Sequence, residues 1–127
     1  MKILIVDDDP KLRNFVAQGL AEHGMESLSA GDGAEAQRVL AAAGPVKPDL
    51  ILLDVMMPGK SGLEFLEELR ASGSDIPVIF VTARRAVAER VSGLKRGADD
   101  YILKPFDPAI LLSRVNAVFR RLKVMAA

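Results

Sequence analysis

Residues 50–58 read Leu-Ile-Leu-Leu-Asp-Val-Met-Met-Pro, an almost unbroken apolar run that carries one acid, Asp54. Pro48 precedes the run and Pro58-Gly59 ends it. This length and these boundaries predict a strand buried on both faces, of the kind found inside parallel sheets. A carboxylate at the end of such a strand is costly unless a cation compensates its charge. We therefore expect a cationic partner beside Asp54.

The size and composition of the chain indicate one soluble domain. The 127 residues include 17 basic and 17 acidic side chains and no cysteine, and half of the residues are hydrophobic. No apolar run approaches the roughly 18 residues of a membrane span, and no secretory signal follows Met1. We expect residues 1–127 to form a single cytoplasmic domain that binds no membrane. The balanced charge also predicts no direct nucleic-acid binding.

Apolar runs of strand length alternate with segments of helical period. We expect strands over residues 3–6, 25–30, 50–54, 76–81 and 101–103. Helices are predicted from residue 10 to about 23, from about 33 to 43, about 63 to 72, around 87–94, and from a cap at Asp107 to about 122. In the first helix, one apolar stripe contains Leu12, Phe15, Val16, Gly19 and Leu20.

Five strands alternating with five helices predict an α/β, doubly wound (βα)5 fold of the flavodoxin-like kind. The sheet should be parallel, with helices on both faces and strand order 2-1-3-4-5. The second strand is the most polar and should lie at an edge. In this topology ligands bind at the carboxyl ends of the first and third strands, where the strand order reverses.

Polar residues follow four of the expected strands at that edge. Asp7, Asp8 and Asp9 follow the first strand, Asp54 ends the third, Thr82 the fourth and Lys104 the fifth. Converging carboxylates repel one another unless a divalent cation lies among them, and Mg²⁺ favours oxygen ligands of this kind. Acids, a metal, a hydroxyl and a lysine together suit phosphoryl transfer, in which an aspartate can be the nucleophile.

Four motifs resemble the receiver domain of the response regulators of bacterial two-component systems. They are residues 3–9 (Ile-Leu-Ile-Val-Asp-Asp-Asp), residues 53–62 from Leu-Asp-Val to Ser-Gly, Val81-Thr82-Ala83, and residues 97–101 (Gly-Ala-Asp-Asp-Tyr) before Lys104-Pro105-Phe106. The resemblance covers essentially the whole chain. It is closest to the receivers of winged-helix transcriptional regulators.

The resemblance implies that Asp54 accepts a phosphoryl group from a sensor histidine kinase. Mg²⁺ would be bound by Asp54, directly by Asp8, mainly through water by Asp7, and by the backbone carbonyl of Met56. Asp9 would take no part.

The resemblance also implies the contacts of the phosphoryl group. Thr82 would donate a hydrogen bond to it, and the backbone amides of Val55 and Ala83 would contact it. Lys104 would pair with Asp54 before phosphorylation, and the bond before Pro105 would be cis. The side chains of Met56 and Arg84 stand where the family tunes hydrolysis, and they predict a long-lived phosphoryl group.

The switch and a homodimer are also implied by the resemblance. Thr82 would move toward the phosphoryl group, and Tyr101 would turn into the space that Thr82 leaves. This change would alter the face built by the fourth helix, the fifth strand and the fifth helix, through which a homodimer would form. Ile110 stands where the winged-helix subgroup carries an acid that pairs with a base such as Arg90. Dimerisation would therefore rest on apolar contact and on Asp100 with an arginine of the last helix.

Two other functions remain open at this stage. A phosphatase of the haloacid-dehalogenase type would use Asp7 as nucleophile and Asp9 as acid/base, but Lys104 follows the pair Asp99-Asp100 instead of preceding it, and Asp54 would have no role. A pseudo-receiver, a binding module that is not phosphorylated, would not need the complete set of acids, threonine and lysine.

Overall fold

A computed structural model describes residues 1–57, 59–83 and 100–126 of the chain, with side chains described as far as Arg121. The expected helix around residues 87–94 lies outside these residues, as do Arg84, Arg90 and Asp99. Among the described residues, no helix is long and apolar enough to cross a membrane.

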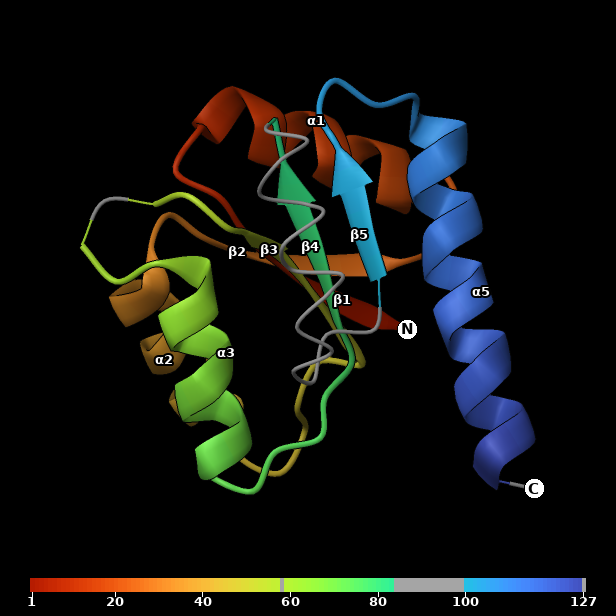
Figure 1. The fold of residues 1–127 in the computed structure, drawn as a ribbon. Helices are drawn as coiled ribbons and strands as arrows, with labels where there is room; N and C mark the ends of the chain where they lie inside the picture. The colour runs from red at the N-terminus through yellow and green to blue at the C-terminus, as the bar shows by residue number, and fades with distance from the viewer. Residues whose placement is uncertain (58, 84–99, 127) are drawn as a thin grey trace.

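Five parallel strands form one sheet in the order β2-β1-β3-β4-β5, as predicted (Figure 1). The strands are β1 (Lys2–Val6), β2 (Glu26–Ala30), β3 (Leu50–Asp54), β4 (Val78–Thr82) and β5 (Asp100–Leu103). β2 lies at an edge, as its polar sequence predicted. β4 begins two residues later than expected, after Pro77, which has no N–H to donate to a neighbouring strand.

The described helices are α1 (Pro10–Ala21), α2 (Gly33–Ala42), α3 (Gly62–Ala71) and α5 (Pro108–Ala126). Each of the first three begins directly after a capping side chain, provided by Asp9, Asp32 and Ser61. These side chains accept hydrogen bonds from backbone N–H groups that have no partner within the helix. Asp107 likewise accepts from the backbone N–H of Ala109, and α5 extends beyond the expected residue 122.

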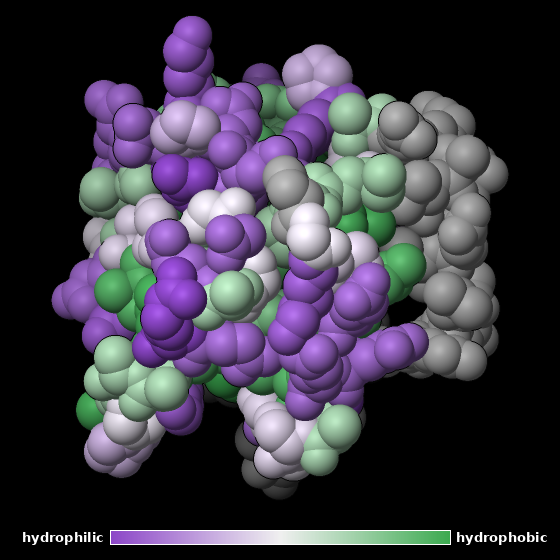
Figure 2. All heavy atoms as spheres, turned by 90° about the vertical axis from the view of Figure 1, so that its left-hand side faces the viewer, coloured by the Kyte–Doolittle hydropathy of each residue, from purple (hydrophilic) through white to green (hydrophobic). Residues whose placement is uncertain are grey.

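The alternating side chains of the strands divide the core into two clusters. Leu4, Val6, Ile51 and Leu53 belong to the cluster that includes buried residues of α2 and α3. Ile3, Ile5, Leu50 and Leu52 belong to the cluster that includes residues of α1 and α5. The central strands therefore bury both faces, with two of these helices over each (Figure 1). Hydrophilic side chains dominate the outer surface on the side of α2 and α3 (Figure 2).

Only part of the apolar stripe of α1 is buried. Phe15 is 49% exposed, whereas Val16 and Leu20 are buried. Phe15 therefore lies at the margin of the stripe, in contact with solvent.

Candidate functional site

Three carboxylates meet at the carboxyl ends of two neighbouring strands. Asp7 and Asp8 follow β1, and Asp54 is the last residue of β3, which pairs with β1. One carboxylate oxygen from each of the three lies within 4.8 Å of the others. Asp7 and Asp54 are only 3% and 5% exposed, whereas Asp8 is exposed to solvent. The residues predicted to bind metal therefore converge at one edge of the sheet.

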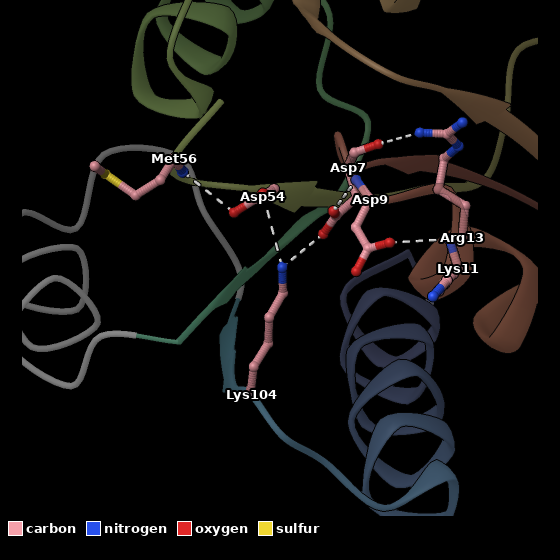
Figure 3. Close-up of polar contacts among 7 residues, drawn as sticks. All are labelled: Asp7, Asp9, Lys11, Arg13, Asp54, Met56 and Lys104. Atoms are coloured by element: carbon pink, nitrogen blue, oxygen red, sulfur yellow. Dashed lines mark hydrogen bonds and ion pairs between the residues drawn. The ribbon is translucent and has the colours of Figure 1, made fainter. Parts of the chain in front are cut away.

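Lys104 reaches this cluster from the end of β5. Its Nζ lies 2.7 Å from Oδ2 of Asp7 and 3.7 Å from Oδ2 of Asp54 (Figure 3). The cation expected beside Asp54 is present, but its shorter contact is with Asp7. The predicted pairing of Lys104 with Asp54 is present, and Lys104 makes a second, shorter contact with Asp7 that was not predicted. The ammonium group therefore lies between two buried carboxylates and compensates both.

The pKa of Asp54 is raised by its surroundings. Burial, followed by the negative charge of Asp7, raises this pKa from 3.8 to about 6, against the opposing effects of Lys104 and of the Met56 N–H. The exposed carboxylate of Asp8 raises it further by a smaller amount. A divalent cation among these carboxylates would relieve the repulsion, because it would compensate more than one of them at once.

Two backbone N–H groups follow Asp54 and point to different acceptors. The N–H of Val55 donates to the carbonyl of Val81, at 3.4 Å, and so continues the pairing of β3 with β4. The N–H of Met56 instead donates to Oδ1 of Asp54, at 3.2 Å. The amide that lies against the Asp54 carboxylate is therefore that of Met56. Contact of the Val55 amide with a phosphoryl group stays a prediction. The Met56 side chain points away from the cluster (Figure 3).

Gly62 lies against the main chain of Asp54. A Cβ atom at Gly62 would stand 2.2 Å from the carbonyl oxygen of Asp54, and its N–H donates to the carbonyl of Val55 at 3.0 Å. Only a residue without a side chain permits this approach. Gly62 was noted in the sequence as part of a motif, but the contact it makes was not foreseen.

The remaining predicted residues lie at the ends of β4 and β5. Thr82 is buried at the end of β4, and its carbonyl accepts from the N–H of Lys104 at 2.8 Å. Ala83 follows it and is exposed. Tyr101 is half-buried and packs against the cluster beneath α2 and α3. The Lys104-Pro105 bond is cis, as predicted.

The donor set suits a hard cation. Carboxylate and carbonyl oxygens are the ligands that Mg²⁺ prefers, and it commonly takes one or two carboxylates and keeps several waters. Two buried carboxylates and the exposed carboxylate of Asp8 satisfy this requirement while leaving one side open to solvent. Asp9 lies outside the group, because its carboxylate caps α1 through the N–H of Lys11.

Residues 3–116 match the family model described as "Response regulator receiver domain". The chain is 46% identical over 123 residues to "Response regulator MprA" of Mycobacterium avium (strain 104), covering 97% of this chain and 53% of that protein. It is 45% identical over 123 residues to the MprA of Mycobacterium tuberculosis (strain CDC 1551 / Oshkosh), covering 97% and 52%. The chain thus spans about half the length of the curated relatives it matches.

Two solved structures are similar over nearly the whole chain. The BeF3-activated N-terminal receiver domain of Klebsiella pneumoniae RstA has a TM-score of 0.81 at 36% identity, covering 94% of this chain and 99% of that chain. The response regulator TrrA of Thermotoga maritima, in complex with Mg(2+)-BeF, has a TM-score of 0.79 at 35% identity, covering 92% and 97%.

These matches do not favour the phosphatase or the pseudo-receiver, and the predicted family and fold are confirmed. With the parallel sheet and the acidic cluster at its edge, they show that the chain belongs to the response regulator receiver domain family, whose members act in phosphorylation-dependent signalling.

Proposed function

We propose that Asp54 accepts a phosphoryl group from a sensor histidine kinase in the presence of Mg²⁺. The observation that carries this proposal is the placement of the buried Asp54 carboxylate beside both Asp7 and Lys104, at the edge of the sheet. A buried carboxylate with acids on one side and an ammonium group in reach can act as a nucleophile toward phosphorus.

In the reaction, a carboxylate oxygen of Asp54 attacks the phosphorus of the kinase phosphohistidine. A P–O bond forms, the P–N bond breaks, and the leaving imidazole nitrogen takes up a proton from solvent water. Mg²⁺, held by Asp7, Asp8, Asp54 and the carbonyl of Met56, would supply charge neutralisation on the phosphoryl oxygens.

The chain's own groups would orient and stabilise the phosphoryl group. The N–H of Met56 already lies against the Asp54 carboxylate and would donate to a phosphoryl oxygen, as would the backbone N–H of Ala83 and the hydroxyl of Thr82. The ammonium group of Lys104 would shift from Asp7 toward the new negative charge on the phosphoryl group. This shift would be short, because the ammonium group already lies 3.7 Å from Asp54.

The proposed output is a change in the surface of β5 and α5. Phosphorylation adds roughly two negative charges at Asp54, which favours movement of Thr82 and burial of Tyr101. A surface hollow of about 740 Å³ beside these elements is lined by residues that include Asp100, Ile110 and Arg114. Ile110 is 50% exposed, and Arg114 pairs with Asp100 at 3.2 Å. A homodimer through this face would use apolar contact together with these charges.

We further propose that residues 1–127 form one receiver domain that works in the cytoplasm and binds neither nucleic acid nor membrane directly. It would catalyse its own phosphorylation and dephosphorylation without a turnover substrate.

The experiment is to incubate the chain with Mg²⁺ and a small phosphodonor such as phosphoramidate, and to map the acyl phosphate by mass spectrometry after borohydride reduction. We expect one modification, at Asp54, and none in Asp54→Asn. Modification at Asp7 would support the phosphatase, and no modification at all would support the pseudo-receiver.

A further inference from the structure

Four hydrogen bonds involve the polar atoms of Asp7, two on its main chain and two on its carboxylate. Its backbone N–H donates to the carbonyl of Ala30 at 3.1 Å, and its Oδ1 accepts from the N–H of Asp9 at 2.9 Å. Its Oδ2 accepts from Nζ of Lys104 at 2.7 Å, and its backbone carbonyl accepts from Nη1 of Arg13 at 2.6 Å. The position of Asp7 is therefore determined on both its side chain and its main chain.

The contact from Arg13 acts on the peptide that joins Asp7 to Asp8. Because a peptide unit is planar, holding the carbonyl oxygen of Asp7 also orients the N–H of Asp8 and places the Cα atom from which the Asp8 side chain extends. Asp8 is exposed, with little packing of its own to hold it. Its carboxylate nevertheless lies within 4.8 Å of those of Asp7 and Asp54.

The position of Arg13 in the fold lets its side chain orient the Asp7-Asp8 peptide. It lies in the first turn of α1, where its own N–H donates to the carbonyl of Asp9 at 3.1 Å. Its guanidinium group lies beside Gly31, at which a Cβ atom would stand 3.4 Å from Nη1. The guanidinium therefore lies between the loop after β1 and the loop after β2, and it approaches Asp7 from the side opposite Lys104 (Figure 3).

We propose that Arg13 is a positioning residue for the metal site, which holds the Asp7-Asp8 peptide so that both carboxylates face the cation. This inference rests on the proposed Mg²⁺ site. A charged donor at a carbonyl makes a strong hydrogen bond, and groups that orient metal ligands commonly change metal affinity by about 10- to 100-fold when removed.

Electrostatics alone predicts the opposite sign. A guanidinium group near a site for a divalent cation repels that cation, so removing its charge should tighten binding. Positioning predicts that removing Arg13 weakens binding. The direction of the change in Mg²⁺ affinity therefore separates the two effects.

The test is isothermal titration calorimetry of MgCl₂ into the full chain at fixed ionic strength. We expect Arg13→Ala to raise the dissociation constant by about tenfold or more, and Arg13→Lys, which can still donate to the carbonyl, to raise it less. Lys11→Ala is the matched control, because it removes an exposed cation from the same helical turn. It should leave the affinity unchanged or slightly tighter.

An NMR measurement and a substitute variant complete the test. In metal-free protein, the ¹⁵N resonance of the Asp8 amide should shift in Arg13→Ala and not in Lys11→Ala, because the carbonyl of the same peptide loses its hydrogen bond. If Arg13→Ala fails to fold by circular dichroism, Arg13→Met, which keeps a long apolar side chain but cannot donate to the carbonyl, is measured with the same two readouts.

An affinity in the Arg13 variant equal to or tighter than that of the unmodified chain would overturn the proposal. Asp8→Asn tests the metal site separately. If Asp8→Asn weakens binding but the Arg13 variant does not, the role of Arg13 is wrong and the proposed function stands. If Asp8→Asn has no effect, the metal site itself is wrong.

Discussion

The ammonium group of Lys104 donates a 2.7 Å hydrogen bond to the carboxylate of Asp7, a residue 97 positions earlier in the chain. The same ammonium lies 3.7 Å from Asp54. One cation thus compensates two buried carboxylates. Its effect on Asp54 is smaller than the effects of burial and of the Asp7 charge, so the pKa of Asp54 remains raised, at about 6.

Asp54→Asn should stabilise the metal-free chain at pH 7. The folded pKa of Asp54, about 6, exceeds the unfolded value of 3.8, so folding becomes less favourable as the pH rises between these values. Above pH 6, the ionised Asp54 lowers the free energy of unfolding by its full amount, on the order of 1–3 kcal/mol. Urea unfolding in EDTA should show this gain at pH 7 and lose most of it below pH 4. A gain that is the same at both pH values would contradict a raised pKa.

Lys104→Met should destabilise the chain at pH 7 by about 3 kcal/mol, because it leaves Asp7 and Asp54 buried without their shared cation. The loss should diminish as the pH falls and Asp54, whose pKa is raised, takes up a proton. Arg114→Met is the control, since it breaks the exposed pair with Asp100 and should cost less than about 1 kcal/mol. Equal losses in the two variants, measured by urea unfolding, would show that Lys104 does not compensate buried charge.

Gly62→Ala should destabilise the chain by about 2 kcal/mol or more and slow the phosphorylation of Asp54. The added Cβ atom would stand 2.2 Å from the carbonyl oxygen of Asp54, so either α3 or the end of β3 must move. Gly19→Ala in α1 is the matched control, because a Cβ atom there would meet nothing within 4 Å. That control should be neutral or stabilising by about 0.5–1 kcal/mol. Thermal unfolding and phosphodonor labelling check both variants. If Gly62→Ala were as stable and as readily phosphorylated as the unmodified chain, the close approach of Gly62 to the Asp54 carbonyl would be wrong.

Tyr101 offers a direct reporter of the proposed switch. It is the only tyrosine, and the chain has no tryptophan, so its fluorescence can be observed alone. We expect Mg²⁺ with beryllofluoride to reduce the quenching of Tyr101 by acrylamide, because the ring turns inward. Thr82→Ala should remove this response. Unchanged quenching in the unmodified chain, with beryllofluoride shown to be bound, would exclude the coupling.

The sequence by itself determined the architecture and which polar residues lie at one edge of the sheet. Apolar runs too short for helices, separated by segments of helical period, are sufficient to specify parallel strands that alternate with helices. Since parallel strands bring their carboxyl ends to one edge, Asp7, Asp8, Asp54, Thr82 and Lys104 had to gather there. The apolar run of residues 50–54 likewise indicated that Asp54 would be buried and would need a cation.

Only the tertiary structure decided how these groups pair. Whether Lys104 lies closer to Asp7 or to Asp54 depends on a difference of about one ångström between its two contacts, 2.7 Å and 3.7 Å. That the N–H of Met56 donates to the Asp54 carboxylate, while that of Val55 pairs with β4, is likewise a matter of backbone geometry. Those differences arise from the packing of segments far apart in the sequence, such as α3 against Asp54 through Gly62. The contact of Arg13 with the carbonyl of Asp7 has no signature in the sequence, because a main-chain carbonyl accepts a hydrogen bond whatever its residue type.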